Sequence, residues 1–446
     1  MRTLLPFQPL NRVVLFSASI VLLISITWAL ARGFVIPSSG SDSYVADNSL
    51  RTGASTDAQI QTLQDQLRAD SNDWQAYSQL GLAYLQKVRE TSDPSYYQKA
   101  EMTLNEALKR QPGDYTAIGG QGALALARHQ FLSALDWGER AKQINPDRPY
   151  AYGVIADAQI ELGRYSEAVD TLQAMVDLRP DMSSYSRISY IRELHGDTSG
   201  ALDMMQRAVD GGVPNAENTA WTRTQLGTLY FNMGKLDQAE IEYEHTLLDR
   251  PGYVYALAGL GRVRAAQGRN DDAIKLLKQA TDIVPMPDFV ITLGDLYKRT
   301  GQQDAALKQY KLVGVIEKLY QANGVDLDME SALFNADHNQ DLEGTVALAR
   351  KAYADRPSIQ GADVLAWTLY KVGNYQEAQK FSQQALQLGT RDALKFFHAG
   401  MIAYQLGDEA HAREYLAQAL AINPYFSLLY SDEAQQTLRA LQPHQN

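Results

Sequence analysis

Apolar side chains along this chain recur at helical spacing, in segments of about 14 residues separated by short polar turns. In one pair of segments, Leu226 and Tyr230 share a helical face, a turn with Gly234 follows, and the second segment carries Tyr243. No segment alternates apolar and polar residues with the period of a β-strand. The pattern therefore predicts an all-α protein built from helical hairpins.

The hairpins repeat at a fixed interval of 34 residues. The prolines that follow the second helix of successive hairpins keep this interval: Pro112, Pro146, Pro180 and Pro214, and again Pro251 and Pro285. Because proline lacks the amide hydrogen and clashes with the preceding turn, each of these positions is expected to end a helix. A period of this length predicts a solenoid, in which each hairpin packs on its neighbours.

One repeat shows which positions matter for packing. Gly227 and Ala239 are small where the two helices of this hairpin would cross, and Tyr243 fills the contact between them. Gly234 ends the first helix, because a left-handed cap is cheapest without a β-carbon. Pro251 then stops the second helix.

This combination of positions resembles the tetratricopeptide repeat (TPR), and the resemblance covers roughly residues 57–424. It implies a superhelical solenoid in which the first helix of each hairpin lines a concave groove. The chain is otherwise similar to exported and membrane-anchored bacterial TPR proteins. The resemblance specifies the fold and leaves the partner open, because one repeat scaffold hosts many partners.

This register places about ten hairpins in the chain. The first begins near Asp73, and Tyr425–Leu441 is expected to form a capping helix that covers the last apolar face. The fourth hairpin ends in a glycine pair, and the second helix of the seventh is expected to run on to about Ala322. We therefore expect joints in the solenoid near residues 211–219 and 314–325.

An apolar stretch near the N-terminus, Val13–Leu30, contains no charged residue and follows Arg2 and Arg12. Its length is just sufficient to span a bilayer as a helix. The basic residues before it favour a cytoplasmic N-terminus. A cleaved signal peptide is the alternative, because Ala29-Leu30-Ala31 fits the small-x-small cleavage pattern.

These boundaries predict the organisation of the whole chain. It comprises residues 1–32 as a transmembrane signal anchor or signal peptide, 33–56 as a flexible linker, 57–441 as the TPR solenoid, and 442–446 as a tail. In both readings of the N-terminal segment the repeats leave the cytoplasm. They are expected to be membrane-anchored on the extracytoplasmic side, or secreted or periplasmic if the segment is cleaved.

Composition narrows the range of functions. A net charge of −11 and a pI near 5.2 argue against a nucleic-acid partner, because phosphate binding needs a basic surface. The absence of cysteine excludes disulfides, thiolate catalysis, cysteine-ligated zinc and a cysteine-linked lipid anchor. Catalytic and phosphate-loop motifs are also absent from the sequence. We therefore expect a non-enzyme without a cofactor or metal.

The late hairpins carry large side chains at the positions that the resemblance assigns to the groove. These candidate partner-binding residues are Phe334, Trp367, Tyr370, Phe397, Met401 and Tyr404. Aromatic anchors dominate recognition, so one hypothesis is a binding floor for an apolar or helical segment of a ligand. The alternative is ordinary packing between helices. The basic groove candidates Arg187, Arg262, Lys298 and Arg299 lack the paired asparagines of the carboxylate clamp in chaperone-tail-binding TPR domains.

A second set of groove candidates is polar. It comprises Glu330, Asp337, His338, Asp363 and His398. Carboxylates and imidazoles together can bind a metal or transfer protons, but these residues follow no fixed ligand spacing, and the alternative is a solvated helix end. The leading hypothesis is a non-catalytic protein–protein interaction scaffold outside the cytoplasm. The alternative is a small-molecule, metal or surface-polymer binding protein, with hydrolytic activity as a variant of that reading.

Overall fold

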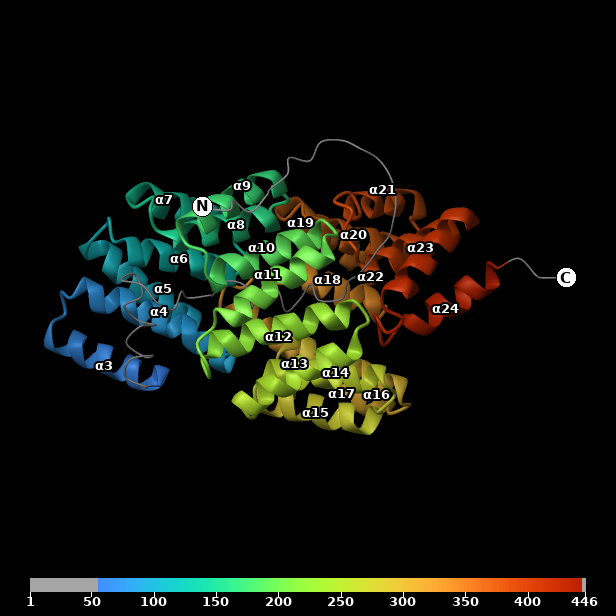
Figure 1. The fold of residues 1–446 in the computed structure, drawn as a ribbon, viewed down its shortest axis with the longest axis horizontal. Coiled ribbons are helices and arrows are strands. Elements are labelled where there is room, and N and C mark those ends of the chain that lie inside the picture. Colours follow the sequence, from blue (N-terminus) through green and yellow to red (C-terminus); the bar gives the residue numbers. More distant parts are fainter. Residues whose placement is uncertain (1–54, 443–446) are drawn as a thin grey trace, which may run out of the picture.

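The computed structural model describes residues 55–442, which form a continuous array of α-helices without a strand in that range (Figure 1). The first helices of the hairpins are α4 (Trp74–Thr91), α6 (Tyr115–Ala127), α8 (Pro149–Glu161), α10 (Met182–Leu194), α12 (Glu217–Asn232), α14 (Val254–Ala266), α16 (Pro287–Arg299), α18 (Asp328–Asp337), α20 (Ile359–Lys371) and α22 (Ala393–Gln405). The second helices are α5 (Ser95–Arg110), α7 (Phe131–Ile144), α9 (Tyr165–Leu178), α11 (Thr198–Asp210), α13 (Leu236–Asp249), α15 (Asn270–Ile283), α17 (Gln303–Ala322), α19 (Leu342–Asp355), α21 (Tyr375–Ala385) and α23 (Glu409–Ile422). Two further helices stand at the ends, α3 (Thr56–Ala69) and α24 (Ser431–Ala440).

The predicted all-α solenoid of helical hairpins is confirmed. Inside the fifth hairpin, a β-carbon added at Gly227 would lie 2.9 Å from the ring of Tyr243, so the two helices meet at this position as the repeat pattern predicts. Tyr243 is fully buried, and its hydroxyl shares a hydrogen bond of 3.0 Å with Thr228. A small residue is needed at position 227 because the large side chain of Tyr243 fills the space where the two helices cross.

Two features at the ends of the array go beyond the sequence pattern. Helix α3 precedes the first hairpin and packs on α4, with Leu63 in the shared core. At the other end, α24 begins only at Ser431, because the preceding residues 424–430 cross the concave side instead of extending a capping helix. The cap predicted over Tyr425–Leu441 is therefore shorter at its start.

The superhelix closes on itself, so that hairpins far apart in sequence touch (Figure 1). His129 donates a hydrogen bond from Nδ1 to the carbonyl of Asp326, 197 residues later, at 2.6 Å. The backbone amide of Ile359 donates to the hydroxyl of Tyr165 at 2.7 Å, across 194 residues. In Figure 1, α19 and α20 lie beside α9 and α10. Successive turns of the superhelix therefore stack directly on each other, and we call this contact the seam.

Glycine permits the close approach at the seam. Gly163, with φ of +71°, has no space for a β-carbon, because the carbonyl oxygen of Pro357 occupies that position. Gly196 meets the carbonyl oxygen of Gly389 in the same way. These residues are turn glycines of the repeat, so the left-handed turn that ends a first helix also forms the docking point for a later loop.

Helix α17 runs on to Ala322, as the sequence predicts, and is the longest of the array at 20 residues. Its inner face carries Val313, Ile316 and Tyr320, which pack in one core with residues of α4 and α5. The hydroxyl of Tyr320 donates to the carbonyl of Ser92 at 3.0 Å. The extension therefore braces the seventh hairpin against the first.

The predicted anchor or signal segment, Val13–Leu30, and nearly all of the predicted linker lie outside the described residues. Within residues 55–442 none of the helices combines the length and the apolar character needed to cross a membrane.

Candidate binding pocket

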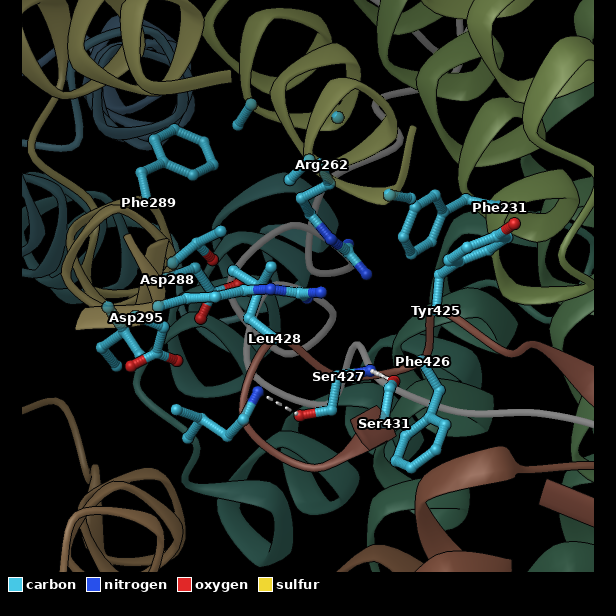
Figure 2. Close-up of a pocket in the computed structure, with 18 of the residues that line it drawn as sticks. Phe231, Arg262, Asp288, Phe289, Asp295, Tyr425, Phe426, Ser427, Leu428 and Ser431 are labelled. Carbon is cyan, nitrogen blue, oxygen red and sulfur yellow. Dashed lines mark hydrogen bonds between the residues drawn. The ribbon is translucent and has the colours of Figure 1, made fainter. Parts of the chain in front are cut away.

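A pocket with a cavity volume of about 310 Å³ opens in the concave groove (Figure 2). Its walls come from α12, α14, α16 and α18, the first helices of hairpins five to eight. The segment 424–435, which leads from α23 into α24, closes the remaining side. The pocket therefore lies on the surface that the TPR resemblance assigns to binding, but in the middle hairpins rather than the late ones.

One wall of the pocket is apolar and carries a cation. Phe231, Phe289, Tyr425 and Leu428 line it, and the guanidinium of Arg262 lies 4.4 Å from the centre of the Phe231 ring. Figure 2 shows Arg262 reaching into the pocket beside Phe231 and Tyr425. Burial lowers the pKa of Arg262 from its ordinary value, although the group stays protonated. This wall is suited to an aromatic or aliphatic side chain that stacks against the rings.

A buried carboxylate–imidazole pair also borders the pocket. His338 Nε2 lies 2.8 Å from Asp295 Oδ1, and the hydroxyl of Tyr310 donates to the same oxygen at 2.8 Å. Burial alone would lower the pKa of His338, but the hydrogen bond and the negative charge of Asp295 outweigh it and raise that pKa. Because both ring nitrogens are already hydrogen-bonded, the second to the Phe334 carbonyl at 2.8 Å, the pair is a fixed part of the wall.

The predicted aromatic candidates lie mostly inside the protein. Phe334, Trp367, Phe397 and Met401 are all buried, and Phe334 alone among them borders the pocket. Trp367 stacks on Tyr370 at 4.7 Å and on His398 at 4.1 Å. Among the six, solvent reaches chiefly Tyr404, which is 41% exposed, and the half-buried Tyr370. Their predicted role in partner binding stays a prediction, with Tyr404 the most accessible of the set.

The polar candidates separate into three places: Asp337 and His338 border the pocket, Asp363 and His398 pair in the late hairpins, and Glu330 lies at the seam. Asp337 accepts hydrogen bonds from the indole of Trp367 at 2.8 Å and from the hydroxyl of Tyr430 at 2.9 Å, and burial raises its pKa. Asp363 lies 3.0 Å from Nδ1 of the fully buried His398.

Glu330 belongs to the seam, where it accepts from Arg356 Nη1 at 3.1 Å. His338 lies at the pocket wall. Among residues 55–442, three or more carboxylate, imidazole or thiol side chains nowhere gather in a way that could hold a metal ion. Each polar candidate has a hydrogen-bonding partner in this fold, and a role of these residues in binding stays a prediction.

Several residues of the pocket and of the seam were not predicted from the sequence. Arg262 was named only as a basic groove candidate, whereas Phe231, Phe289 and Asp295 were not named. Their position on groove-lining first helices was the available signal. The contact of Arg356 with Glu161, at 2.7 Å and 195 residues apart, had no signal in the local sequence.

Four family models of the tetratricopeptide repeat match this chain, at residues 125–188, 224–285, 362–399 and 396–426. The chain is a tetratricopeptide repeat protein. TPR proteins generally act as non-catalytic scaffolds for protein–protein interactions.

Two curated relatives of this TPR protein illustrate the range of similar chains. "Cellulose synthase operon protein C" of Komagataeibacter sucrofermentans is 24% identical over 324 residues, which is 68% of this chain and 23% of that protein. "Anaphase-promoting complex subunit 7" of Arabidopsis thaliana is 22% identical over 185 residues, which is 41% of this chain and 32% of that protein. The matched region thus spans about a third or less of the length of these relatives.

Two solved structures of other proteins show a likeness to this chain. The Cut9–Hcn1 hetero-tetramer matches with a TM-score of 0.37 and 13% identity, over 90% of this chain and 96% of that chain. The human IFIT1 dimer with m7Gppp-AAAA matches with a TM-score of 0.48 and 16% identity, over 76% of this chain and 80% of that chain.

Proposed function

We propose that this TPR protein is a non-catalytic scaffold that binds a segment of a protein partner in the pocket of hairpins five to eight. The observation that carries the proposal is the segment 424–430, which runs along the pocket and presents Tyr425 and Leu428 to it. The groove thus already accommodates a stretch of non-helical chain with aromatic and aliphatic side chains. A partner segment of similar character would lie beside it.

The size and chemistry of the pocket fit such a ligand. A volume of about 310 Å³ holds a few large side chains. Tyr425 is 44% exposed and offers a stacking surface, while the buried rings of Phe231 and Phe289 add apolar lining and Arg262 adds a cation over the Phe231 ring. The carboxylate of Asp295 is paired with His338, so the ligand meets a polar group that is already hydrogen-bonded.

We propose further that Val13–Leu30 holds the array at the extracytoplasmic side of a membrane, with secretion after cleavage as the alternative. The support is the length of this apolar stretch and the arginines before it. Residues 1–54 lie outside the described structure. Protease treatment of intact cells tests the proposal, because repeats outside the cytoplasm would be cut while a cytoplasmic control protein stays whole.

A second candidate function is a role of this scaffold in polysaccharide production. Relatives named "Cellulose synthase operon protein C" from two Komagataeibacter sources each match 68% of the chain. In that case the partner would belong to the machinery that makes or secretes a surface polymer. Loss of cell-surface polysaccharide after deletion of the gene would support it, and unchanged polysaccharide would speak against it.

Site-specific crosslinking of the full chain tests the pocket. Tyr425→p-benzoylphenylalanine places a photoreactive ring at the pocket, since Tyr425 is 44% exposed there. Met102, on α5 and 68% exposed, gives a matched control position away from the pocket. We expect one defined protein to crosslink in the native cell from position 425 and not from position 102.

The same experiment can contradict the proposal. Identical crosslinks from both positions, or none from position 425, would argue against a partner in the pocket. A small molecule or metal that co-purifies with the full chain and is lost in the variant Phe289→Ala would favour the alternative of a ligand-binding protein.

A further inference from the structure

The outer face of α17 exposes an unusual group of large apolar side chains. Leu312, Val315 and Leu319 lie three and four residues apart and so share one helical face, and Leu307 flanks them. Val315 is 64% exposed and Leu319 is 51% exposed. The opposite face of α17 packs in the core through Val313, Ile316 and Tyr320. This packing fixes the orientation of the helix, so the outer face points away from the core.

Three lysines accompany these apolar residues. Lys308, Lys311 and Lys318 are exposed on the same side of α17, and none of them forms an ion pair with any residue between 55 and 442. One carboxylate of the helix, the exposed Asp304 in the first turn, lies one helical turn before Lys308 on this side, so the three lysines leave the face with a net positive charge. The other, Glu317, accepts a hydrogen bond from Ser331 on α18 at 2.8 Å. In a chain with a net charge of −11, this outer face is locally basic and apolar.

The face lies near the point where the N-terminal part of the chain joins the array. Thr56, at the start of α3, donates from Oγ1 to Glu90 at 2.6 Å, near the end of α4. Two residues later, the carbonyl of Ser92 accepts from Tyr320 at the end of α17. The start of α3 and the end of α17 thus both contact the C-terminal end of α4.

This placement matters because of what precedes Thr56 in the sequence. The apolar stretch Val13–Leu30 is separated from Ser55 by residues 31–54. A chain of that length spans at most about 80 Å when fully extended. A bilayer that holds Val13–Leu30 would therefore be within reach of the α17 face.

We propose that the outer face of α17 is a peripheral contact surface for an anionic bilayer. The four apolar side chains would enter the boundary between head groups and acyl chains, and the three lysines would pair with lipid phosphates. The proposal depends on the proposed membrane anchor only for bringing the bilayer near. A second copy of the chain is a poorer occupant, because a two-fold contact would place these lysines against each other.

The absence of cysteine makes a direct test available. Single-cysteine variants Val315→Cys and Leu319→Cys of the full chain would carry a polarity-sensitive fluorophore. Leu248→Cys is the matched control, because Leu248 is an apolar residue on α13 with 78% exposure. The labelled chains are reconstituted into vesicles of neutral phosphatidylcholine, either alone or with about 30% anionic phosphatidylglycerol. Nitroxide-labelled lipids in the vesicles serve as quenchers.

We expect lipid quenching at positions 315 and 319 in the anionic vesicles that is several-fold stronger than at position 248. Combining Lys308→Gln, Lys311→Gln and Lys318→Gln should return both labels to the level of the control. Equal quenching at all three positions, or quenching that ignores the anionic lipid, would overturn the proposal. Labels that are shielded from solvent in detergent without lipid would also overturn it, because they would indicate self-association. A full chain that associates with neither vesicle type would overturn it as well.

The outcome is separable from that of the proposed function. Crosslinking from position 425 reports on the pocket in the concave groove, whereas quenching at positions 315 and 319 reports on the outer face of α17. A failed crosslink with strong quenching would therefore remove the partner pocket and retain the membrane contact.

Discussion

Arg356 donates hydrogen bonds from Nε and Nη2 to the same carboxylate oxygen of Glu161, at 2.9 and 2.7 Å, although 195 residues separate the two. Both side chains are buried, and Arg356 also reaches Glu330 through Nη1. The phenyl ring of Phe131 lies 4.8 Å from the guanidinium. One buried cation thus joins the third hairpin to the eighth across the seam.

Replacing Arg356 should strongly destabilise the protein. Arg356→Ala would leave Glu161 and Glu330 buried without their cation, and breaking a buried pair in this way costs about 3–5 kcal/mol. Thermal or urea unfolding of the purified protein measures the loss. The control is Arg350→Ala, whose ion pair with Glu377 is exposed and contributes about 0–1 kcal/mol. Equal midpoints for the two variants would show that the seam is not held by this cluster.

Asp295 should control the protonation of His338. Asp295→Asn removes the negative charge that raises the pKa of His338, so this pKa should fall as burial becomes the dominant effect. Titration of the imidazole by NMR measures the change. Asp304→Asn, which alters an exposed carboxylate on α17, is the control and should leave the titration in place.

The same pair makes stability depend on pH in a defined direction. The pKa of His338 is raised in the folded state, so its contribution is fully present below the unfolded pKa of about 6.5 and is lost as pH rises through the folded pKa. The wild type should therefore unfold at a higher temperature than Asp295→Asn at low pH, and the difference between the two thermal midpoints should shrink as pH rises. A gap that widens instead would contradict this sign.

Gly227 should tolerate no large side chain. In Gly227→Leu the new atoms would meet the ring of Tyr243, and overpacking of this kind costs about 1–3 kcal/mol. Gly314 is a matched control within α17, because no atom lies within 4 Å of a β-carbon there, so Gly314→Leu should be neutral or stabilising. Thermal unfolding compares the two. An unchanged midpoint for Gly227→Leu would count against the crossing described for the fifth hairpin.

Trp367 and Tyr404 should separate packing from binding. Trp367→Ala removes a buried ring stacked on Tyr370 and His398, with an expected cost of about 3–5 kcal/mol. Tyr404→Ala changes a side chain that is 41% exposed and should cost little stability. Once a partner is known, loss of binding in Tyr404→Ala at an unchanged thermal midpoint would support its predicted role. Unchanged binding would remove it.

The repeat itself could be predicted from the sequence, because the determinants of each hairpin lie within one period. Gly227, Tyr243 and Gly234 specify a crossing and a turn from local chemistry, and the structure places them so. The length of α17 was also predictable, since Asn323 and Gly324 end it. These features depend on neighbours no more than about one repeat away.

The pocket and the seam could not be predicted in this way. Glu161 and Arg356 read as ordinary charged residues until the superhelix brings them together. Trp367 reads as a groove aromatic, but Tyr430 from the C-terminal segment shares Asp337 with it and closes that side. Which groove positions remain open depends on how tightly the superhelix winds, and that property is the sum of many small rotations between hairpins.

The seam changes how this array is expected to fold. A solenoid whose repeats touch only their neighbours can assemble from any point and propagate along the chain. Here the hydrogen bond between Tyr165 and the amide of Ile359 can form only after 194 further residues have been synthesised. The hydrogen bond between the Phe231 carbonyl and Asn423 likewise spans 192 residues. Contacts between residues so far apart in sequence slow folding. The last steps of folding therefore require the complete C-terminal part of the array. Loss of the final hairpin should thus weaken the fifth, and partly made chains would hold their early hairpins incompletely docked.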